Sequence, residues 1–194
     1  MLRVIDNGEN NAFIKGNNDK FDNVVVQFKG NNGYVQIEDN CRLSDLKIIV
    51  GEGYKVTIGT SCILKGRLSA IKGNIFIGSN NEVTGVLKCN AAEDKNIRIG
   101  NNCLISSVRI RTSDQHSIIN LDTNTRINYG GDVTVGDKVL IFEDVYIGKS
   151  VSIGNSSVIA TRAVVTKNIP ANSIAGGVPA KVIKTGIEWM KELI

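Results

Sequence analysis

Short segments in which apolar and variable residues alternate recur along the chain and are its most regular feature. Six of them, each continuing into mostly polar positions, read YVQIEDNC, KVTIGTSC, NIFIGSNN, NIRIGNNC, DVTVGDKV and SVSIGNSS. The second apolar residues of these segments lie 21, 19, 22, 36 and 18 positions apart, near multiples of 18, and are Ile37, Ile58, Ile77, Ile99, Val135 and Ile153. A repeat of this kind indicates a solenoid of stacked coils.

From Val135 onward the period shortens to six residues. An apolar residue occurs at each sixth position, at Val135, Ile141, Ile147, Ile153, Ile159 and Val165. Three such units make an 18-residue coil with three flat sides, in which each strand pairs in parallel with its counterpart about 4.8 Å along the axis. The apolar residues point inward, and Gly and Asn occupy the corners, where φ can be positive. We therefore expect an all-β fold, a parallel β-helix that forms a single domain over residues 1–194.

Two segments depart from the repeat. Residues 112–131, TSDQHSIINLDTNTRINYGG, are polar and too long for a corner, and loops of this length are usually functional or disordered. The C-terminal GIEWMKELI, about residues 186–194, has apolar residues at helical spacing and predicts a short helix that covers the last coil. We assign Trp189 in this segment to packing rather than to contact with adenine.

Composition and charge narrow the classes of function. The chain of 194 residues is 42% hydrophobic, and its net charge is +4, which argues against disorder. The modest charge, with no basic run and no zinc-binding spacing, argues against nucleic-acid binding. No apolar stretch approaches the roughly 18 residues of a membrane span, and the N-terminus has no signal-peptide pattern. We therefore expect a cytoplasmic protein.

Three of the four cysteines occupy one position of the repeat. Cys41, Cys62 and Cys103 each lie four residues after a repeat isoleucine, at a small inward-facing position. We interpret them as a column of buried residues rather than as metal or redox sites, and we expect no disulfide. Cys89 lies outside the column and has no assigned role.

The 112–131 loop contains the only histidine of the chain, His116. Histidine is the residue type whose unperturbed pKa lies near neutrality, so a neutral imidazole is suited to take a proton from a hydroxyl. Position alone also allows an ordinary exposed polar residue. One histidine is too few for the three-histidine zinc site of the carbonic anhydrases that have a similar coil pattern, and we expect no metal.

Three segments carry a resemblance to a known family: SDQHSI, RINYGGDVTVGDKV and VIATRAVVTKNIPANSIAGGVPAKVIK. With them the chain resembles the hexapeptide-repeat acyltransferases, particularly those that O-acetylate bacterial capsular and lipopolysaccharide sugars. The resemblance implies a left-handed helix, a homotrimer with active sites between subunits, and acetyl-CoA as co-substrate. It also implies that His116 is the general base for direct transfer of the acetyl group to a sugar hydroxyl, without an acyl-enzyme.

The same resemblance assigns binding positions for CoA near the end of the chain. Ala160 and Thr161 match a corner that offers backbone groups to the pantetheine arm, and Thr166 and Lys167 match a pair near the phosphates. Lys181 and Lys184 match basic residues that meet the charge of the nucleotide, a role that lysine performs as a point charge. The alternative is that these are ordinary surface lysines.

Residues that contact the acceptor are expected near the loop. Arg109 and Arg111 precede it and are suited to an anionic sugar, although both also fit as outward-facing strand residues. Asp114 is a candidate to orient His116 or to bind a sugar hydroxyl, and Glu143 is a candidate acceptor contact. Relatives have Trp-Ile-Gly where this chain has Leu-Ile-Phe at residues 140–142, so a wall of the acceptor or acetyl pocket differs.

Two other functions compete with O-acetyl transfer. One is N-acetylation of a nucleotide-linked amino sugar, a class that often carries an additional N-terminal domain. The repeat is recognisable here from about Tyr34, which leaves no room for such a domain before it. The other is a non-catalytic β-helix that serves as a binding platform, for which no CoA binding is expected.

Overall fold

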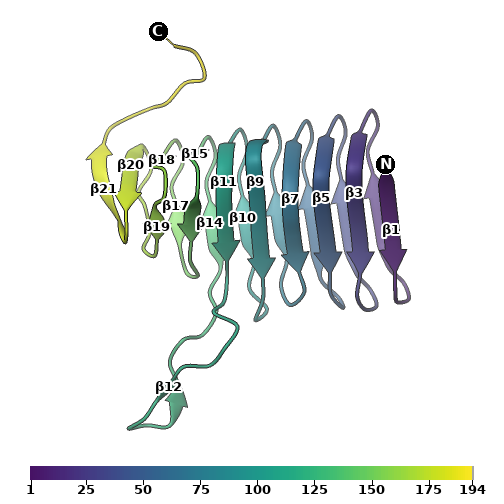
Figure 1. Ribbon diagram of the computed structural model, residues 1–194, viewed down its shortest axis with the longest axis horizontal. Helices are drawn as coiled ribbons and strands as arrows, with labels where there is room; N and C mark the ends of the chain where they lie inside the picture. Colours follow the sequence, from purple (N-terminus) through teal and green to yellow (C-terminus); the bar gives the residue numbers. More distant parts are fainter. Residues whose placement is uncertain (194) are drawn as a thin grey trace.

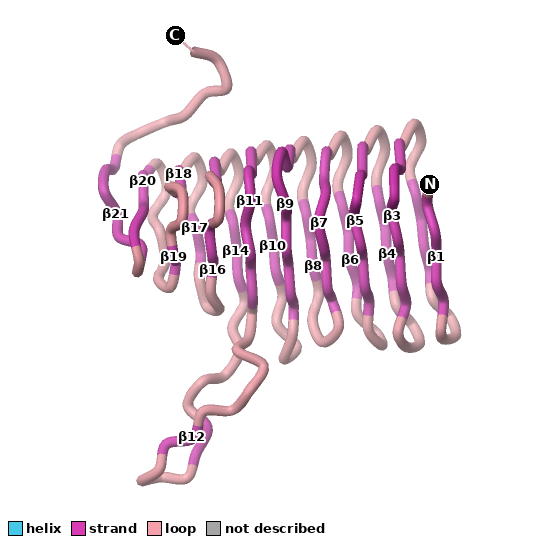
Figure 2. Tube along the Cα trace, in the orientation of Figure 1, coloured by secondary structure: helices cyan, strands magenta, loops and turns pink. Residues whose placement is uncertain are grey.

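The computed structural model describes residues 1–193 and has the form of a left-handed parallel β-helix of about eight turns. Its coils stack along one axis from β1 (Leu2–Asp6) at one end to β21 (Ala180–Thr185) at the other, and one loop projects from the stack (Figures 1 and 2). The all-β prediction is confirmed, and the regular pairing begins at Leu2, well before Tyr34.

Two large sheets form the sides of the helix, and a two-stranded sheet lies in the loop. The twelve-stranded sheet comprises β1, β3 (Lys20–Phe28), β5 (Arg42–Val50), β7 (Ile63–Ala70), β9 (Glu82–Ala91), β11 (Leu104–Arg111), β15 (Leu140–Ile141), β16 (Val145–Ile147), β18 (Val158–Ile159), β19 (Val164–Val165), β20 (Ser173–Gly177) and β21. The seven-stranded sheet comprises β2 (Ala12–Lys15), β4 (Tyr34–Ile37), β6 (Lys55–Ile58), β8 (Ile75–Ile77), β10 (Ile97–Ile99), β14 (Val133–Val135) and β17 (Ser152–Ile153). In the loop, β12 (Ile119–Asn120) pairs with β13 (Thr125–Arg126).

The two halves of the helix have coils of different length. Early in the chain Lys20 pairs with Arg42, 22 positions on, whereas late in the chain Leu140 pairs with Val158, 18 positions on. The cause is visible where the two halves meet, because β11 pairs with both β15 and β16. One long strand of the first half therefore spans two sides that are formed by separate short strands in the second half. The six-residue period therefore applies to the second half, and the first half has wider coils.

The inward-facing apolar residues form the core as predicted. The six repeat residues that lie 18 to 36 positions apart are between 0% and 4% exposed, and they are Ile37, Ile58, Ile77, Ile99, Val135 and Ile153. Successive members come from strands that pair directly, such as Ile58 with Ile77 and Ile99 with Val135. Each aliphatic side chain thus stacks on its equivalent in the next coil, and burial is repeated along the axis.

The cysteine column is buried, as expected. The thiols of Cys41, Cys62 and Cys103 lie 3.1–3.2 Å from glycine carbonyl oxygens of the next coil, to which they donate. Burial raises the pKa of the Cys103 thiol to about 11, and burial also raises the pKa of Cys89, which faces the core from β9. Cys89 and Cys103 are therefore packed side chains with little thiolate at neutral pH.

Asparagine and glycine have separate tasks at the corners. Nine asparagines have positive φ, among them Asn40, Asn80 and Asn102, because asparagine tolerates the left-handed region. Most corner glycines do not have positive φ; instead the next coil leaves no room for a side chain. A Cβ on Gly136 would lie 2.2 Å from Oδ1 of Asn155. Close coil-to-coil approach, rather than φ, therefore requires glycine there.

The expected C-terminal helix is wrong for residues 186–193, which have no regular secondary structure, and residue 194 lies outside the described residues. The chain turns at Gly186, where φ is 70°, and Ile187 N then donates to the carbonyl of Asn172. Trp189 Nε1 donates to the carbonyl of Lys138 at 2.6 Å, so the tail follows the corners of earlier coils. A helix this short is marginal without a packing face, and the corner carbonyls provide competing partners.

The end of the twelve-stranded sheet is closed by a strand rather than by a helix. β21 pairs antiparallel with β20 and is the last strand of that sheet. Within residues 1–193 the structure has no helix of the length and apolarity needed to cross a membrane.

The stacked core predicts a sharp difference between neighbouring positions of one strand. Ile58→Ala, at a side chain that is 0% exposed, should lower the free energy of unfolding by about 2–5 kcal/mol because it leaves a cavity between coils. Thr57→Ala, on the outward face of the same strand, should cost less than about 1 kcal/mol. Urea denaturation measures both, and equal losses would contradict the assignment of the core face.

Candidate active site

The loop that carries His116 leaves the helix between β11 and β14. Figure 1 shows it projecting from the coils, with β12 at its far end. Leu104 of β11 pairs with Leu140 of β15, 36 positions later in the chain. The extra residues therefore leave the stack without disturbing the pairing on either side. The predicted loop at residues 112–131 is confirmed by its place in the structure.

Glu93, at the corner after β9, fastens three parts of the loop to the helix. Its carboxylate accepts hydrogen bonds from Ser113 Oγ, from Arg126 Nη2 at 2.7 Å and from Gly130 N at 3.2 Å. These bonds, that from Arg126 above all, lower the pKa of Glu93 to about 2. One carboxylate therefore holds the start, the middle and the end of the loop together.

Asn128, which is 8% exposed, links the segment on either side of His116. Its Nδ2 donates to the carbonyl of His116 at 2.8 Å and to Oδ2 of Asp114 at 2.9 Å, and its Oδ1 accepts from Ile118 N at 2.7 Å. Lys149, on the next coil, donates to Oδ2 of Asp114 and to the carbonyl of Asn128. The backbone of His116 is thereby fixed relative to the helix.

The carboxylate of Asp114 already accepts hydrogen bonds from two residues of this framework. The ammonium of Lys149, and then the amide of Asn128, lower the pKa of the Asp114 carboxyl. No hydrogen bond among residues 1–193 joins Asp114 to the imidazole of His116. The structure gives Asp114 a part in holding the loop, and its role toward a sugar hydroxyl stays a prediction.

The exposed side chain of His116 lines a pocket of about 480 Å³ between the loop and the twelve-stranded sheet. Three cationic side chains line this pocket, Arg67, Lys72 and Arg126, against one carboxylate, that of Glu93, which is paired with Arg126. The neutral Ser69 and Asn90 also line it. The pocket is open to solvent and has room for a sugar ring. The imidazole therefore faces an electropositive space rather than the core.

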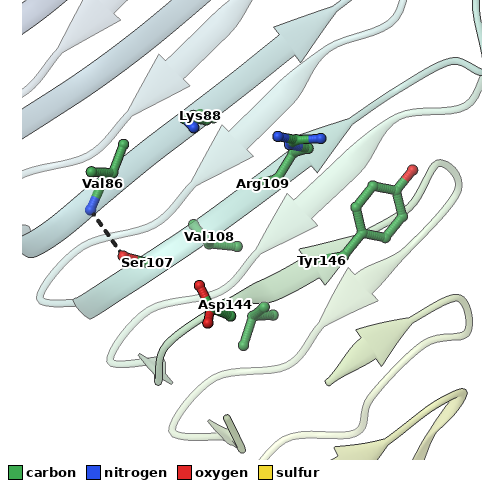
Figure 3. Close-up of a pocket in the computed structure, with 8 residues that line it drawn as sticks. Val86, Lys88, Ser107, Val108, Arg109, Asp144 and Tyr146 are labelled. Atoms are coloured by element: carbon green, nitrogen blue, oxygen red, sulfur yellow. Dashed lines mark hydrogen bonds between the residues drawn. The ribbon is translucent and has the colours of Figure 1, made fainter. Parts of the chain in front are cut away.

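Two further pockets continue along the same sheet. The nearer contains Arg67, Lys88, Arg109 and Arg111, and the farther contains Lys88, Arg109, Asp144 and Tyr146. Figure 3 shows Lys88, Arg109 and Tyr146 rising from three adjacent strands. The structure thus places Arg109 and Arg111, predicted as acceptor contacts, in a groove that reaches His116.

The residues predicted to bind CoA, together with Glu143, lie apart from His116 within a single chain. Ala160 follows β18 and lies against Gly176 of β20, which pairs with Lys181 of β21. The remaining positions are exposed on the last coils or the corner before them, and they are Thr161, Thr166, Lys167, Lys184 and Glu143. The pocket that His116 lines contains none of these residues.

The framework around His116 was not predicted from the sequence. Glu93, Arg126, Asn128 and Lys149 are polar residues of a kind common on surfaces, and they are separated by up to 56 positions. The available signal was the single long insertion, which requires anchors at its base. No group of three or more His, Cys, Asp or Glu side chains suited to a metal ion occurs within residues 1–193.

A left-handed β-helix from which one coil projects a histidine-bearing loop is the architecture implied by the resemblance to hexapeptide-repeat acyltransferases. No protein-family model matches the chain. Individual proteins do. The polysialic acid O-acetyltransferase of Escherichia coli O1:K1 / APEC is 35% identical over 139 residues, 70% of this chain and 45% of that protein. The polysialic acid O-acetyltransferase of Neisseria meningitidis is 31% identical over 140 residues, 72% of this chain and 55% of its own.

The fold agrees with solved structures of the same kind of protein. The crystal structure of the polySia-specific acetyltransferase NeuO superposes with a TM-score of 0.86 at 34% identity, covering 98% of this chain and 83% of that one. The crystal structure of the polysialic acid O-acetyltransferase OatWY superposes with a TM-score of 0.68 at 27% identity, covering 100% of this chain and 93% of that one. The chain therefore belongs to the family of these acetyltransferases. It spans about half the length of the two relatives compared by sequence.

The lowered pKa of Glu93 predicts how the loop responds to pH. A carboxylate whose pKa falls from 4.5 to about 2 on folding contributes stability that is complete above pH 4.5 and is lost as the pH falls toward 2. Glu93→Gln should therefore reduce the hydrogen-exchange protection of the loop amides at pH 7. It should also remove part of their pH dependence between 4.5 and 2.

The matched control is Glu52→Gln, at an exposed corner of an earlier coil. Protection factors corrected for intrinsic exchange should match wild type in that variant. Identical loop protection in Glu93→Gln and wild type at pH 7 would show that Glu93 does not fasten the loop.

Proposed function

We propose that this protein transfers an acetyl group from acetyl-CoA to a hydroxyl of an acidic capsular saccharide, a polymer of sialic acid being the leading candidate. The observation that carries the proposal is the position of His116 in an electropositive pocket of a chain related to polysialic acid O-acetyltransferases. The reaction belongs to the cytoplasm, a reducing compartment that suits four buried free cysteines.

His116 acts as general base in this proposal. Its neutral imidazole takes the proton of the acceptor hydroxyl while that oxygen forms a bond to the thioester carbonyl carbon. The carbon–sulfur bond then breaks, and the imidazolium returns the proton to the thiolate of CoA. The bond from Asn128 to the His116 carbonyl supports this role, because it limits where the ring can lie.

Direct transfer is favoured because the two candidate nucleophiles within residues 1–193, Ser113 and Cys103, are not activated. Ser113 Oγ is engaged with the Glu93 carboxylate, and Cys103 is 1% exposed with its pKa raised to about 11. Neither side chain is suited to carry an acetyl group.

The CoA positions and His116 are brought together, we propose, by a neighbouring subunit. The loop exposes five large apolar side chains, Ile118, Ile119, Leu121, Ile127 and Tyr129, of which Leu121 is 94% exposed. Apolar surface of this kind on a projecting hairpin is typical of an interface. A homotrimer in which the loop of one subunit reaches the last coils of the next completes the site.

In that assembly the last coils bind acetyl-CoA. Ala160 and Thr161 provide backbone groups to the pantetheine arm, and Thr166 and Lys167 lie near the phosphates. Lys181 and Lys184, both exposed on β21, meet the remaining negative charge.

Residues 140–142, which the resemblance assigns to a wall of the acceptor or acetyl pocket, depart from the Trp-Ile-Gly pattern of relatives. Phe142 is 40% exposed next to the exposed Glu143, whose backbone carbonyl accepts from Arg162 N. We propose that Glu143 and Asp114 contact acceptor hydroxyls. An amino acceptor has less support, because the related proteins are named O-acetyltransferases.

The assignment of the base predicts a large loss of turnover. His116→Ala should lower the rate of acetyl transfer to oligosaccharides by roughly 10²–10⁴, the usual contribution of a general base. The assay compares wild type and variant on sialic acid polymers, neutral oligosaccharides and amino sugars. The molecular mass in solution, measured by light scattering, should be the same for both.

Equal rates for the two proteins would remove His116 from the mechanism. Absence of CoA binding in wild type would instead favour a non-catalytic platform. Preferred use of amino sugars would favour N-acetyl transfer.

The CoA assignment predicts a salt-dependent defect. Lys181→Glu should weaken CoA binding, more strongly at low than at high ionic strength, because the lost contact is between exposed charges. Calorimetric titration at two salt concentrations measures this, with Lys29→Glu, an exposed lysine of an early coil, as control. An unchanged affinity in Lys181→Glu would remove that residue from the site.

A further inference from the structure

Cationic side chains of four successive coils are aligned in register on the outside of the twelve-stranded sheet. Lys47 of β5 pairs with Arg67 of β7, Arg67 pairs with Lys88 of β9, and Lys88 pairs with Arg109 of β11. Their neighbours in each strand, such as Leu68, Leu87 and Ile110, are buried, so the four charged residues face outward. We call this row the cationic ladder. Its steps are about 4.8 Å, the spacing of adjacent strands.

The ladder lacks ion-pair partners within the described chain. Asp144 lines the farther pocket with Lys88 and Arg109, but its ion pair is with Arg162. None of its four members takes part in a salt bridge among residues 1–193. Like charges directly opposite one another in a sheet are destabilising, so three such steps in a row carry a cost for the free protein. A row of anionic groups with a similar repeat removes that cost.

The ladder adjoins the pocket that contains His116. Arg67, Lys88 and Arg109 line the middle pocket, and Arg67 also lines the pocket of His116. A parallel row of hydrogen-bonding groups runs beside it, in which Ser69 pairs with Asn90 and Asn90 with Arg111. A chain bound along the ladder is therefore offered charge contacts, neutral contacts and a base in the pocket beside Arg67.

We propose that the cationic ladder is an extended binding site for a polyanionic saccharide, which lies along the helix axis and presents one sugar unit to His116. The inference rests on the proposed acetyl transfer and adds residues that hold the acceptor several units away from the reacting hydroxyl. Carboxylates repeated along a polymer match the ladder, because guanidinium and ammonium groups both pair with carboxylates. A short acceptor contacts fewer of the four cations and binds more weakly.

The test removes two central charges and compares a matched pair on the other sheet. Arg67→Gln/Lys88→Gln loses one arginine and one lysine from the ladder. Arg98→Gln/Lys55→Gln loses the same two charges from the seven-stranded sheet, where both lie over Phe76. Binding of fluorescently labelled polysialic acid is measured directly, and KM values for the polymer and for acetyl-CoA are measured beside it.

The ladder variant should bind the polymer about tenfold more weakly than wild type, as expected when two exposed ion contacts are lost. Its affinity should depend less on salt, since fewer ion contacts remain to be screened. The KM for the polymer should rise in parallel and the KM for acetyl-CoA should stay unchanged. The control pair should match wild type, and thermal unfolding by circular dichroism should verify that all proteins are folded.

Three outcomes would overturn the proposal. They are equal polymer binding by both double variants, no polymer binding by wild type, and a rise confined to the KM for acetyl-CoA, which would assign the ladder to CoA phosphates. Failure of the proposed function is recognised separately: wild type then binds the polymer through the ladder but transfers no acetyl group to it.

Discussion

The in-register stacking of equivalent side chains from one coil to the next is the constraint on which the rest of the structure depends. Each inward aliphatic residue, from Ile37 to Ile153, is buried by its counterparts above and below rather than by a distant element. Close packing between coils leaves no space for a Cβ at corners such as Gly136. Register therefore governs both the core and the corners.

The same constraint determines where a long insertion is tolerated. Residues 112–131 lie outside the pairing, and the strands on either side of them remain aligned across 36 positions. An excluded loop has no core of its own, so its conformation depends on polar contacts with the helix. Glu93 and Asn128 make those contacts, and they join the position of His116 to the rigid coils.

Register also turns sequence positions about 20 residues apart into neighbours on the surface. Lys47, Arg67 and Lys88 are about 20 positions apart in the sequence, yet the pairing of β5, β7 and β9 makes them neighbours. A repeated inward residue builds the core, and a repeated outward residue builds an extended, regularly spaced surface. The β-helix is for this reason a suitable frame for a polymer with a regular charge repeat.

The sequence by itself determined the β-helix, the burial of the cysteine column and the loop around His116, because each of these features follows from the local repeat or from an interruption of it. Tertiary structure decided the width of the first coils, where β11 covers two sides, and the contacts of Glu93 and Lys149. It also decided the irregular tail, because the spacing of Ile187 and Met190 suits a helix but corner carbonyls accept hydrogen bonds from Ile187 N and Trp189 Nε1. Periodicity reports the environment of each residue along its own strand, whereas contacts between coils depend on register, which is settled only when the whole stack forms.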